Sequence, residues 1–220
     1  MRWPFGPRGP ETAAKPVAAG ASQAAAEEHR SPAFAALVAS LHPERRPQVL
    51  DLGRPIGSNI EWLSSRNCRV FVVDLHRSLL AETIETRKGE NFVRLLQRLV
   101  PLAEDDRFDA VLAWDLFNYL RPDQIAALMA RLAPACRPGA LLLALVTTHR
   151  ELPAAPMRYR ILGPQTLAWE GAATPTRIAP GYHERDFTRL MPGFQLKSSL
   201  LLRNGIQEYL FAAQSESPAG

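Results

Sequence analysis

The chain has 220 residues, of which 46% are hydrophobic, so it is long enough for one domain with a sizeable core and too short for two. Charged residues make up 22% of it. No apolar stretch approaches the roughly 18 residues that cross a bilayer, which excludes a membrane span. The net charge is only +4, with basic and acidic residues interspersed, so nucleic-acid binding is disfavoured.

The two cysteines, Cys68 and Cys136, are far apart and have no partner pattern. They provide neither a disulfide framework nor a thiolate zinc site. We therefore expect no bound metal and a reducing, cytoplasmic location.

Residues 1–30 are rich in proline, glycine and alanine, and they contain no continuous apolar core followed by a cleavage site. This composition predicts a flexible tail that adds nothing to the fold, and it is not that of a secretory signal. Trp3 and Phe5 leave a second interpretation open, in which the tail docks on a partner or on the domain surface. We expect order to begin at Ser31, which precedes a proline at the first position of an amphipathic helix.

Short apolar runs separated by helical sequence predict buried strands in the middle of the chain. They cover residues 48–52, 69–74, 108–113 and 140–146. Continuous apolar strands that alternate with amphipathic helices are typical of a parallel sheet covered on both faces.

The last third of the chain changes in character. Residues 150–182 are rich in loop formers and indicate an insertion. Asn204-Gly205 lies between two apolar runs, which is the strongest short-range signal of a hairpin. We therefore predict one doubly wound α/β domain over 31–213, with a mostly parallel seven-stranded sheet, helices on both faces, a C-terminal antiparallel β-hairpin and a disordered end at 214–220.

A strand, a glycine-bearing turn and a helix start follow one another over residues 49–59, an arrangement that presents backbone amides to a ligand. Asp74 ends the next strand about 20 residues after Gly53, where an acidic side chain can accept hydrogen bonds from ribose hydroxyls. Dinucleotide-binding turns use the pattern G-x-G-x-x-G, and the spacing of Gly53 and Gly57 does not match it. A nicotinamide or flavin dinucleotide is therefore disfavoured.

These residues resemble the class I S-adenosylmethionine-dependent methyltransferases. The first motif of that family is an acidic residue followed by G-x-G-x-G, and Asp51, Gly53 and Gly57 match it. The acidic residue that ends the family's second strand corresponds to Asp74. The resemblance runs from about residue 31 to 213, and it is greatest to a bacterial methyltransferase-like group whose motif L-D-L-G is followed, six residues on, by an asparagine equivalent to Asn59.

The resemblance implies a transferase with S-adenosylmethionine as its cofactor. It implies that the Gly53 loop lies against the methionine part, that Asp51 orients the methionine amine and that Asp74 holds the ribose. Asn59, at the helix start, binds the methionine carboxylate or only satisfies a backbone amide.

Two departures from the family pattern leave other functions open. Pro55 stands where the central glycine is expected, and it removes one N–H donor from the loop. The acidic residue that meets the adenine after the third strand has no counterpart in residues 92–101, where Gln97 is the candidate substitute. The alternatives are a non-catalytic scaffold or regulatory subunit with a degenerate cofactor loop, and a module that binds a nucleoside without turning it over.

Methyl transfer from a sulfonium needs mainly an in-line approach of the acceptor, so a catalytic dyad is not required. If a base is used, the candidates follow the carboxyl ends of strands: Asp115, Asn118 and Tyr119 after one strand, and His149 after the next. Asp115 is alternatively the cap of a short helical turn. His149 and His183 are alternatively exposed loop residues.

The insertion at 150–182 is expected to form a lid and a pocket for a small-molecule acceptor, and the sequence sets no oligomeric state. The motif of asparagine or aspartate, two prolines and an aromatic residue, which relatives that methylate amino groups and nucleic acids carry, is absent at 114–119, and its absence disfavours those substrates. Arginines interleaved with aromatic residues suit a small acidic or aromatic acceptor, or else they form a solvated surface above packed rings. They are Arg150, Arg158, Arg160, Arg177, Tyr159, Trp169 and Tyr182.

Overall fold

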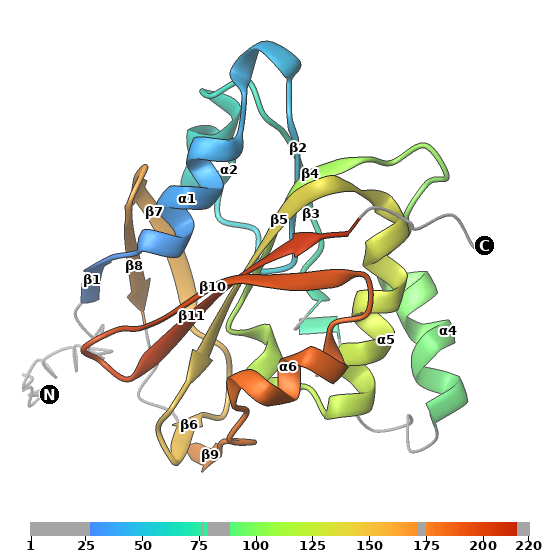
Figure 1. The fold of residues 1–220 in the computed structure, drawn as a ribbon. Helices are drawn as coiled ribbons and strands as arrows, with labels where there is room; N and C mark the ends of the chain where they lie inside the picture. Colours follow the sequence, from blue (N-terminus) through green and yellow to red (C-terminus); the bar gives the residue numbers. More distant parts are fainter. Residues whose placement is uncertain (1–26, 76, 79–88, 171–174, 215–220) are drawn as a thin grey trace, which may run out of the picture.

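The computed structural model describes residues 27–75, 77–78, 89–170 and 175–214, with a six-stranded sheet at the centre (Figure 1). The strand order is β10-β11-β5-β4-β2-β3. The strands are β2 (Gln48–Asp51), β3 (Arg69–Val72), β4 (Phe108–Trp114), β5 (Cys136–Thr147), β10 (Phe194–Leu201) and β11 (Ile206–Ala213). Strands β3, β2, β4 and β5 are parallel neighbours, whereas β11 pairs antiparallel with both β5 and β10. This last pair is the hairpin that Asn204-Gly205 predicts.

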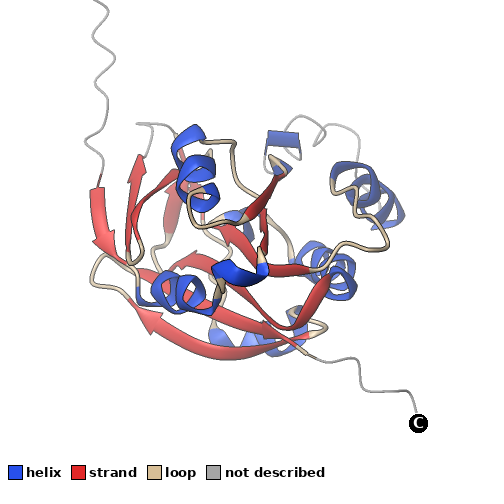
Figure 2. Cartoon of the chain, turned by 90° about the horizontal axis from the view of Figure 1, so that it is seen from above, coloured by secondary structure: helices blue, strands red, loops and turns tan. Residues whose placement is uncertain are grey.

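Helices cover both faces of the sheet (Figure 2), because its strands are apolar on both sides. One hydrophobic cluster lies under α1 (Pro32–Ser40) and α2 (Gly57–Ser64). The other lies under α4 (Gly89–Leu99), α5 (Pro122–Leu132) and α6 (Glu184–Leu190). Alternate residues of one strand enter opposite clusters, as Val111 and Leu112 of β4 do. The doubly wound arrangement is therefore as predicted.

The prediction of seven strands in one sheet is wrong for the described part of the chain, where the sheet has six. The third strand of the family was expected near residues 92–101, and these residues lie in and after α4. Phe92, Leu95 and Leu96 are buried at helical spacing, so one apolar stripe packs on the sheet, whereas Val93, Arg94, Gln97 and Arg98 are exposed. A half-buried strand would have needed buried and exposed residues that alternate along the chain.

The insertion forms two small sheets of its own. Strands β6 (Glu151–Pro153) and β9 (Thr176–Ile178) pair antiparallel. Strands β7 (Arg158–Gly163) and β8 (Thr166–Glu170) form a hairpin that joins β1 (Glu27–Arg30) in a three-stranded sheet. This second sheet packs into the same hydrophobic cluster as α1, through Tyr159, Ile161 and Leu167.

The predicted tail boundary at residue 30 is wrong, because β1 belongs to the fold. The rings of His29 and Trp169 are in contact, with centroids 4.1 Å apart and planes tilted by 46°. Ala33 follows β1 at the start of α1. Its backbone N–H donates to the carboxylate of the fully buried Glu208 at 3.0 Å, and this hydrogen bond holds the start of α1. Trp3 and Phe5, as well as the predicted disordered end beyond Gln214, lie outside the described residues. None of the helices in the described ranges has the length and hydropathy of a membrane-spanning segment.

Candidate functional site

The loop between β2 and α2 lies at the point where the sheet reverses its order, since β3 is on one side of β2 and β4 on the other. In open α/β sheets, ligands bind outside the carboxyl ends of the strands at such a point. Arg54, Pro55 and Gly57 are exposed there, whereas Ile56 is buried and anchors the loop. The loop is thus placed as the sequence predicts.

Gly53 is needed for a contact inside the protein. A Cβ atom at this position would lie 2.6 Å from Cδ1 of Trp114, so the indole ring of Trp114 covers the glycine. Trp114 ends β4, and its Nε1 donates to Oδ1 of Asp51 at 2.7 Å, an oxygen that also accepts from Gly53 N at 2.9 Å. Tyr159 of β7 stacks on the indole with centroids 5.3 Å apart and planes 6° apart. Burial raises the pKa of Asp51 to about 6, although the hydrogen bonds oppose the shift.

Asn59 satisfies backbone groups, which is the second of the two interpretations of the sequence, but the groups belong to the distant strand β7. Its Nδ2 donates to the carbonyl of Tyr159 at 2.8 Å, and its Oδ1 accepts from the amide of Ile161 at 2.8 Å. The side chain is buried and satisfies two backbone groups of β7. Asn59 therefore fastens the inserted hairpin to α2.

Gly57 and Asp74 remain at the surface of the loop region. Nothing lies within 4 Å of a Cβ atom placed on Gly57. Asp74 is half-buried beyond the end of β3, and its Oδ1 accepts from the backbone of Arg77 at 3.0 Å. Gln97 is exposed on α4 and lines neither of the two cavities described below.

Two cavities lie side by side at this edge of the sheet. The smaller one, here called the loop hollow, has a volume of about 20 Å³ and is lined by residues 52–54, 56, 113–116 and 156–159. The larger one, here called the edge pocket, has a volume of about 200 Å³. Asp115 and Met157 line both, so they form the wall between the two cavities.

The structure brings the predicted candidates Asp115, Asn118, Tyr119 and His149 together in the edge pocket. The other lining residues are Thr147, Glu151, Leu152, Pro153, Met157, Trp169, Asn204 and Ile206. Residues that follow β4 and β5 therefore meet residues of the insertion. Sequence reasoning missed Trp114, Met157 and Glu151, which carry no motif and acquire their positions through long-range contacts.

Asp115 is the buried acid of the site, with only 4% of its surface exposed. Its Oδ2 accepts from the amide of Met157 at 3.1 Å, and its side chain does not cap the short helix Leu116–Tyr119 that follows. Burial raises the pKa of Asp115 to about 7, against the effect of that hydrogen bond. A carboxyl group that titrates near neutral pH is suited to exchange a proton with a ligand.

The neighbours of Asp115 are fixed by hydrogen bonds to the backbone. Asn118 Nδ2 donates to Leu145 O at 3.0 Å, so this side chain braces the ends of β4 and β5. The Tyr119 hydroxyl lies 3.1 Å from the carbonyl of Pro153, and burial raises its pKa, so it keeps its proton. His149 is exposed, with Nε2 at 2.8 Å from the carbonyl of Asn204.

The arginines of the insertion do not gather in the edge pocket. Arg158 and Arg160 lie 3.9 and 3.4 Å from the carboxylate of Glu170, in ion pairs on the surface of the β7–β8 hairpin. The guanidinium of Arg177 lies over the ring of Tyr119 at 5.7 Å and is not a lining residue. The alternative of a solvated arginine surface therefore describes Arg158 and Arg160. Of the aromatic residues Tyr159, Trp169 and Tyr182, Trp169 alone lines the edge pocket.

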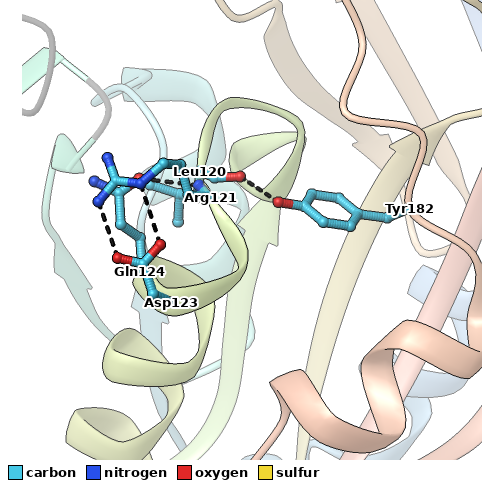
Figure 3. A network of polar contacts seen from close by, with 5 residues as sticks. All are labelled: Leu120, Arg121, Asp123, Gln124 and Tyr182. Atoms are coloured by element: carbon cyan, nitrogen blue, oxygen red, sulfur yellow. Dashed lines mark hydrogen bonds and ion pairs between the residues drawn. The ribbon is translucent and has the colours of Figure 1, made fainter.

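Tyr182 ties the end of the insertion to the start of α5 (Figure 3). Its hydroxyl donates to the carbonyl of Leu120 at 2.6 Å, next to Arg121, whose guanidinium is paired with Asp123 at 2.9 Å. The backbone of Arg121 also donates to Oε1 of Gln124 at 2.9 Å. His183, placed in the lid by the sequence, is exposed at the start of α6. These contacts fix the connection rather than line a pocket.

Comparisons with known proteins agree with this architecture. The family model described as methyltransferase domain matches residues 49–139. A search of curated proteins found no match. Among solved structures, an S-adenosylmethionine-dependent methyltransferase from Mesorhizobium loti is 15% identical, with 80% of this chain and 95% of that chain covered and a TM-score of 0.50. A 1,6-didemethyltoxoflavin N1-methyltransferase from Burkholderia thailandensis is 20% identical, with coverage of 84% and 80% and a TM-score of 0.45.

Residues 49–139 thus match a methyltransferase domain, and the chain has the fold of S-adenosylmethionine-dependent methyltransferases, whose cofactor is S-adenosylmethionine. The match covers strands β2, β3 and β4 and the loop that carries Gly53. It stops before the insertion, so it bears on the cofactor side of the site and not on the acceptor.

The residues present fit one end of this cofactor and not the other. Asp74 and the open surface at Gly57 suit a ribose and its neighbouring groups. At the methionine end, Asn59 is committed to β7, and the face of Gly53 is covered by Trp114. A hollow of about 20 Å³ holds one or two water molecules. Ligand sites measure about 300–1,000 Å³.

Proposed function

We propose that the protein transfers a methyl group from S-adenosylmethionine to a small molecule held in the edge pocket. The observation that carries this proposal is the shared wall: Asp115 and Met157 line both the loop hollow and the edge pocket. A donor at the loop and an acceptor in the pocket would meet at this wall. Close approach of two bound reactants supplies most of the rate enhancement that this chemistry needs.

Each residue has a role that its surroundings support. The cofactor supplies a methyl group on a positively charged sulfur. Asp74 accepts hydrogen bonds from the ribose, while Asp115 accepts a proton from the acceptor. Trp169 and Met157 form apolar walls that exclude water from the pocket.

Binding of the complete cofactor requires the Trp114 indole to leave Gly53, since the loop hollow is too small while the indole fills it. That movement would break the hydrogen bond to Asp51 and the stacking on Tyr159. A reducing cytoplasm remains our proposal for the location, and the two buried free thiols of Cys68 and Cys136 are consistent with it.

We expect isothermal titration to detect binding of S-adenosylmethionine and of its demethylated product, and Asp74→Asn to weaken both about tenfold or more, because a hydrogen bond to a charged group contributes about 1.5–3 kcal/mol. Asp105→Asn is the matched control, since Asp105 is exposed and distant in sequence from the loop. Equal affinity of wild type and Asp74→Asn would contradict the assignment of the ribose to Asp74.

A second candidate function is a non-catalytic scaffold that keeps the fold without the cofactor. Two observations favour it: Asn59 is hydrogen-bonded to the backbone of β7, and the indole of Trp114 covers Gly53. The same titration separates the two functions: absence of heat with S-adenosylmethionine, its product and adenosine would support the scaffold. Binding of adenosine alone would support a module that holds a nucleoside.

A further inference from the structure

We propose that the edge pocket binds a planar nitrogen base, an aromatic ring that carries a basic nitrogen group, and that this group donates hydrogen bonds to Asp115. This inference rests on the proposed function only in naming the base as the methyl acceptor. Of the acidic or aromatic acceptor that the arginines and aromatic residues of the insertion suggested from the sequence, it keeps the aromatic ring and replaces the acidic group by a basic one.

The size and walls of the pocket set the shape of the ligand. Its volume is about 200 Å³. A cavity of about 150 Å³ lined by apolar side chains accepts benzene, so one ring with a substituent fits. Trp169, Leu152, Met157 and Ile206 contribute flat or apolar surface. A planar ring packs against such walls, and the ring of Trp169 can stack on it.

The charge of the lining sets the polarity of the ligand. The acidic side chains Asp115 and Glu151 line the pocket, and none of the lining residues in the described part of the chain is lysine or arginine. Glu151 is exposed, and its Oε2 accepts from the hydroxyl of Thr176 at 2.8 Å. Arg177 is the nearby cation, held over the Tyr119 ring at 5.7 Å. An anionic ligand would meet two carboxyl groups without a lysine or arginine among the lining residues.

The hydrogen bonds of the lining point to the same conclusion. The amide nitrogen of Asn118 donates to the carbonyls of Asp115 and Leu145, at 3.1 and 3.0 Å. The Tyr119 hydroxyl is placed to donate to the carbonyl of Pro153, and Nε2 of His149 faces the carbonyl of Asn204. These three side chains are thus directed at backbone carbonyls, whereas the carboxyl group of Asp115 can accept from a ligand. Burial raises the pKa of Asp115 to about 7 because it disfavours the ionised carboxylate. A positively charged ligand beside Asp115 would favour the ionised carboxylate.

Three probes of equal size and shape test the proposal: benzamidine, benzamide and benzoate, which are cationic, neutral and anionic. Each is titrated at pH 8 into the full-length protein without cofactor, and binding is followed by ligand-observed NMR and by the indole N–H signal of Trp169. We expect benzamidine to bind at least about tenfold more tightly than benzoate, with benzamide between them. We expect Asp115→Asn to abolish the preference and the control Asp105→Asn to retain it.

Tighter binding of benzoate than of benzamidine would overturn the proposal, and this result needs no variant. Binding of benzamidine that neither moves the Trp169 signal nor responds to Asp115→Asn would overturn it too. Failure of this proposal can be distinguished from failure of the proposed function. If the protein binds benzamidine but not S-adenosylmethionine, the proposed base site is supported and the proposed methyltransferase function is contradicted. If it binds S-adenosylmethionine but not benzamidine, the methyltransferase function is supported and this class of acceptor is contradicted.

Discussion

Asn59→Ala is expected to lower the free energy of unfolding by about 3–5 kcal/mol, because it leaves a buried carbonyl and a buried amide without partners. Those two groups are Tyr159 O and Ile161 N of β7, which Asn59 bonds at 2.8 Å each. The measurement is urea unfolding of the protein without cofactor. Its slope should stay unchanged, because a change in midpoint alone reports a change in stability.

Ser58→Ala is the matched control, since Ser58 is the preceding residue, is exposed and lies in the same turn of α2. We expect this control to unfold within about 0.5 kcal/mol of wild type, as surface substitutions usually do. If Asn59→Ala matched the control and changed only cofactor affinity, Asn59 would be a cofactor ligand and its structural role would be wrong.

Asp115→Asn is expected to stabilise the protein at pH 8 by about 4 kcal/mol while leaving its stability near pH 4 unchanged. The pKa of Asp115 is about 7 in the folded protein, compared with 3.8 for an ordinary aspartate. Between these values the folded state holds a proton that the unfolded state has released, so wild-type stability falls as the pH rises from about 4 to about 7. Asparagine does not titrate, and its oxygen can still accept from the amide of Met157.

Thermal and urea unfolding of wild type and Asp115→Asn across this pH range measures the difference. Asp51, whose pKa burial raises to about 6, titrates in both proteins, so subtraction isolates Asp115. Asp105→Asn provides the control for an exposed carboxyl group and should show no such difference. A pH-independent difference would show that Asp115 is ionised in the folded state. Stabilisation by removing a functional side chain is a common feature of active sites.

The sequence predicts the main sheet well where local patterns decide the structure. Apolar runs give β2, β3, β4 and β5, and Asn204-Gly205 gives the antiparallel pair of β10 and β11. The residues of the edge pocket were also accessible, because the carboxyl ends of adjacent parallel strands meet at one edge of the sheet. For this reason Asp115, Tyr119 and His149 could be named before the structure was known.

What the sequence could not predict depends on contacts between distant segments. Asn59 forms hydrogen bonds with residues that are 100 and 102 positions away in the sequence. Strand β1 pairs with β8, which is also distant in the sequence. Trp114 reads as the end of a buried strand, and nothing local shows that its indole lies on Gly53. The arginines suggested an anionic acceptor because their partner, Glu170, lies on the neighbouring strand of a hairpin whose pairing the sequence left open.

We propose that the loop hollow is the donor side of a two-cavity site and opens when Trp114 moves. This movement is measured by titrating S-adenosylmethionine while recording the four indole N–H signals, assigned by Trp→Phe variants. Trp114 Nε1 is bonded to Asp51 at 2.7 Å, whereas Trp62 lies on α2 and packs against Phe34. We expect a large shift of the Trp114 signal with little change at Trp62. An unmoved Trp114 signal at saturating S-adenosylmethionine would contradict it.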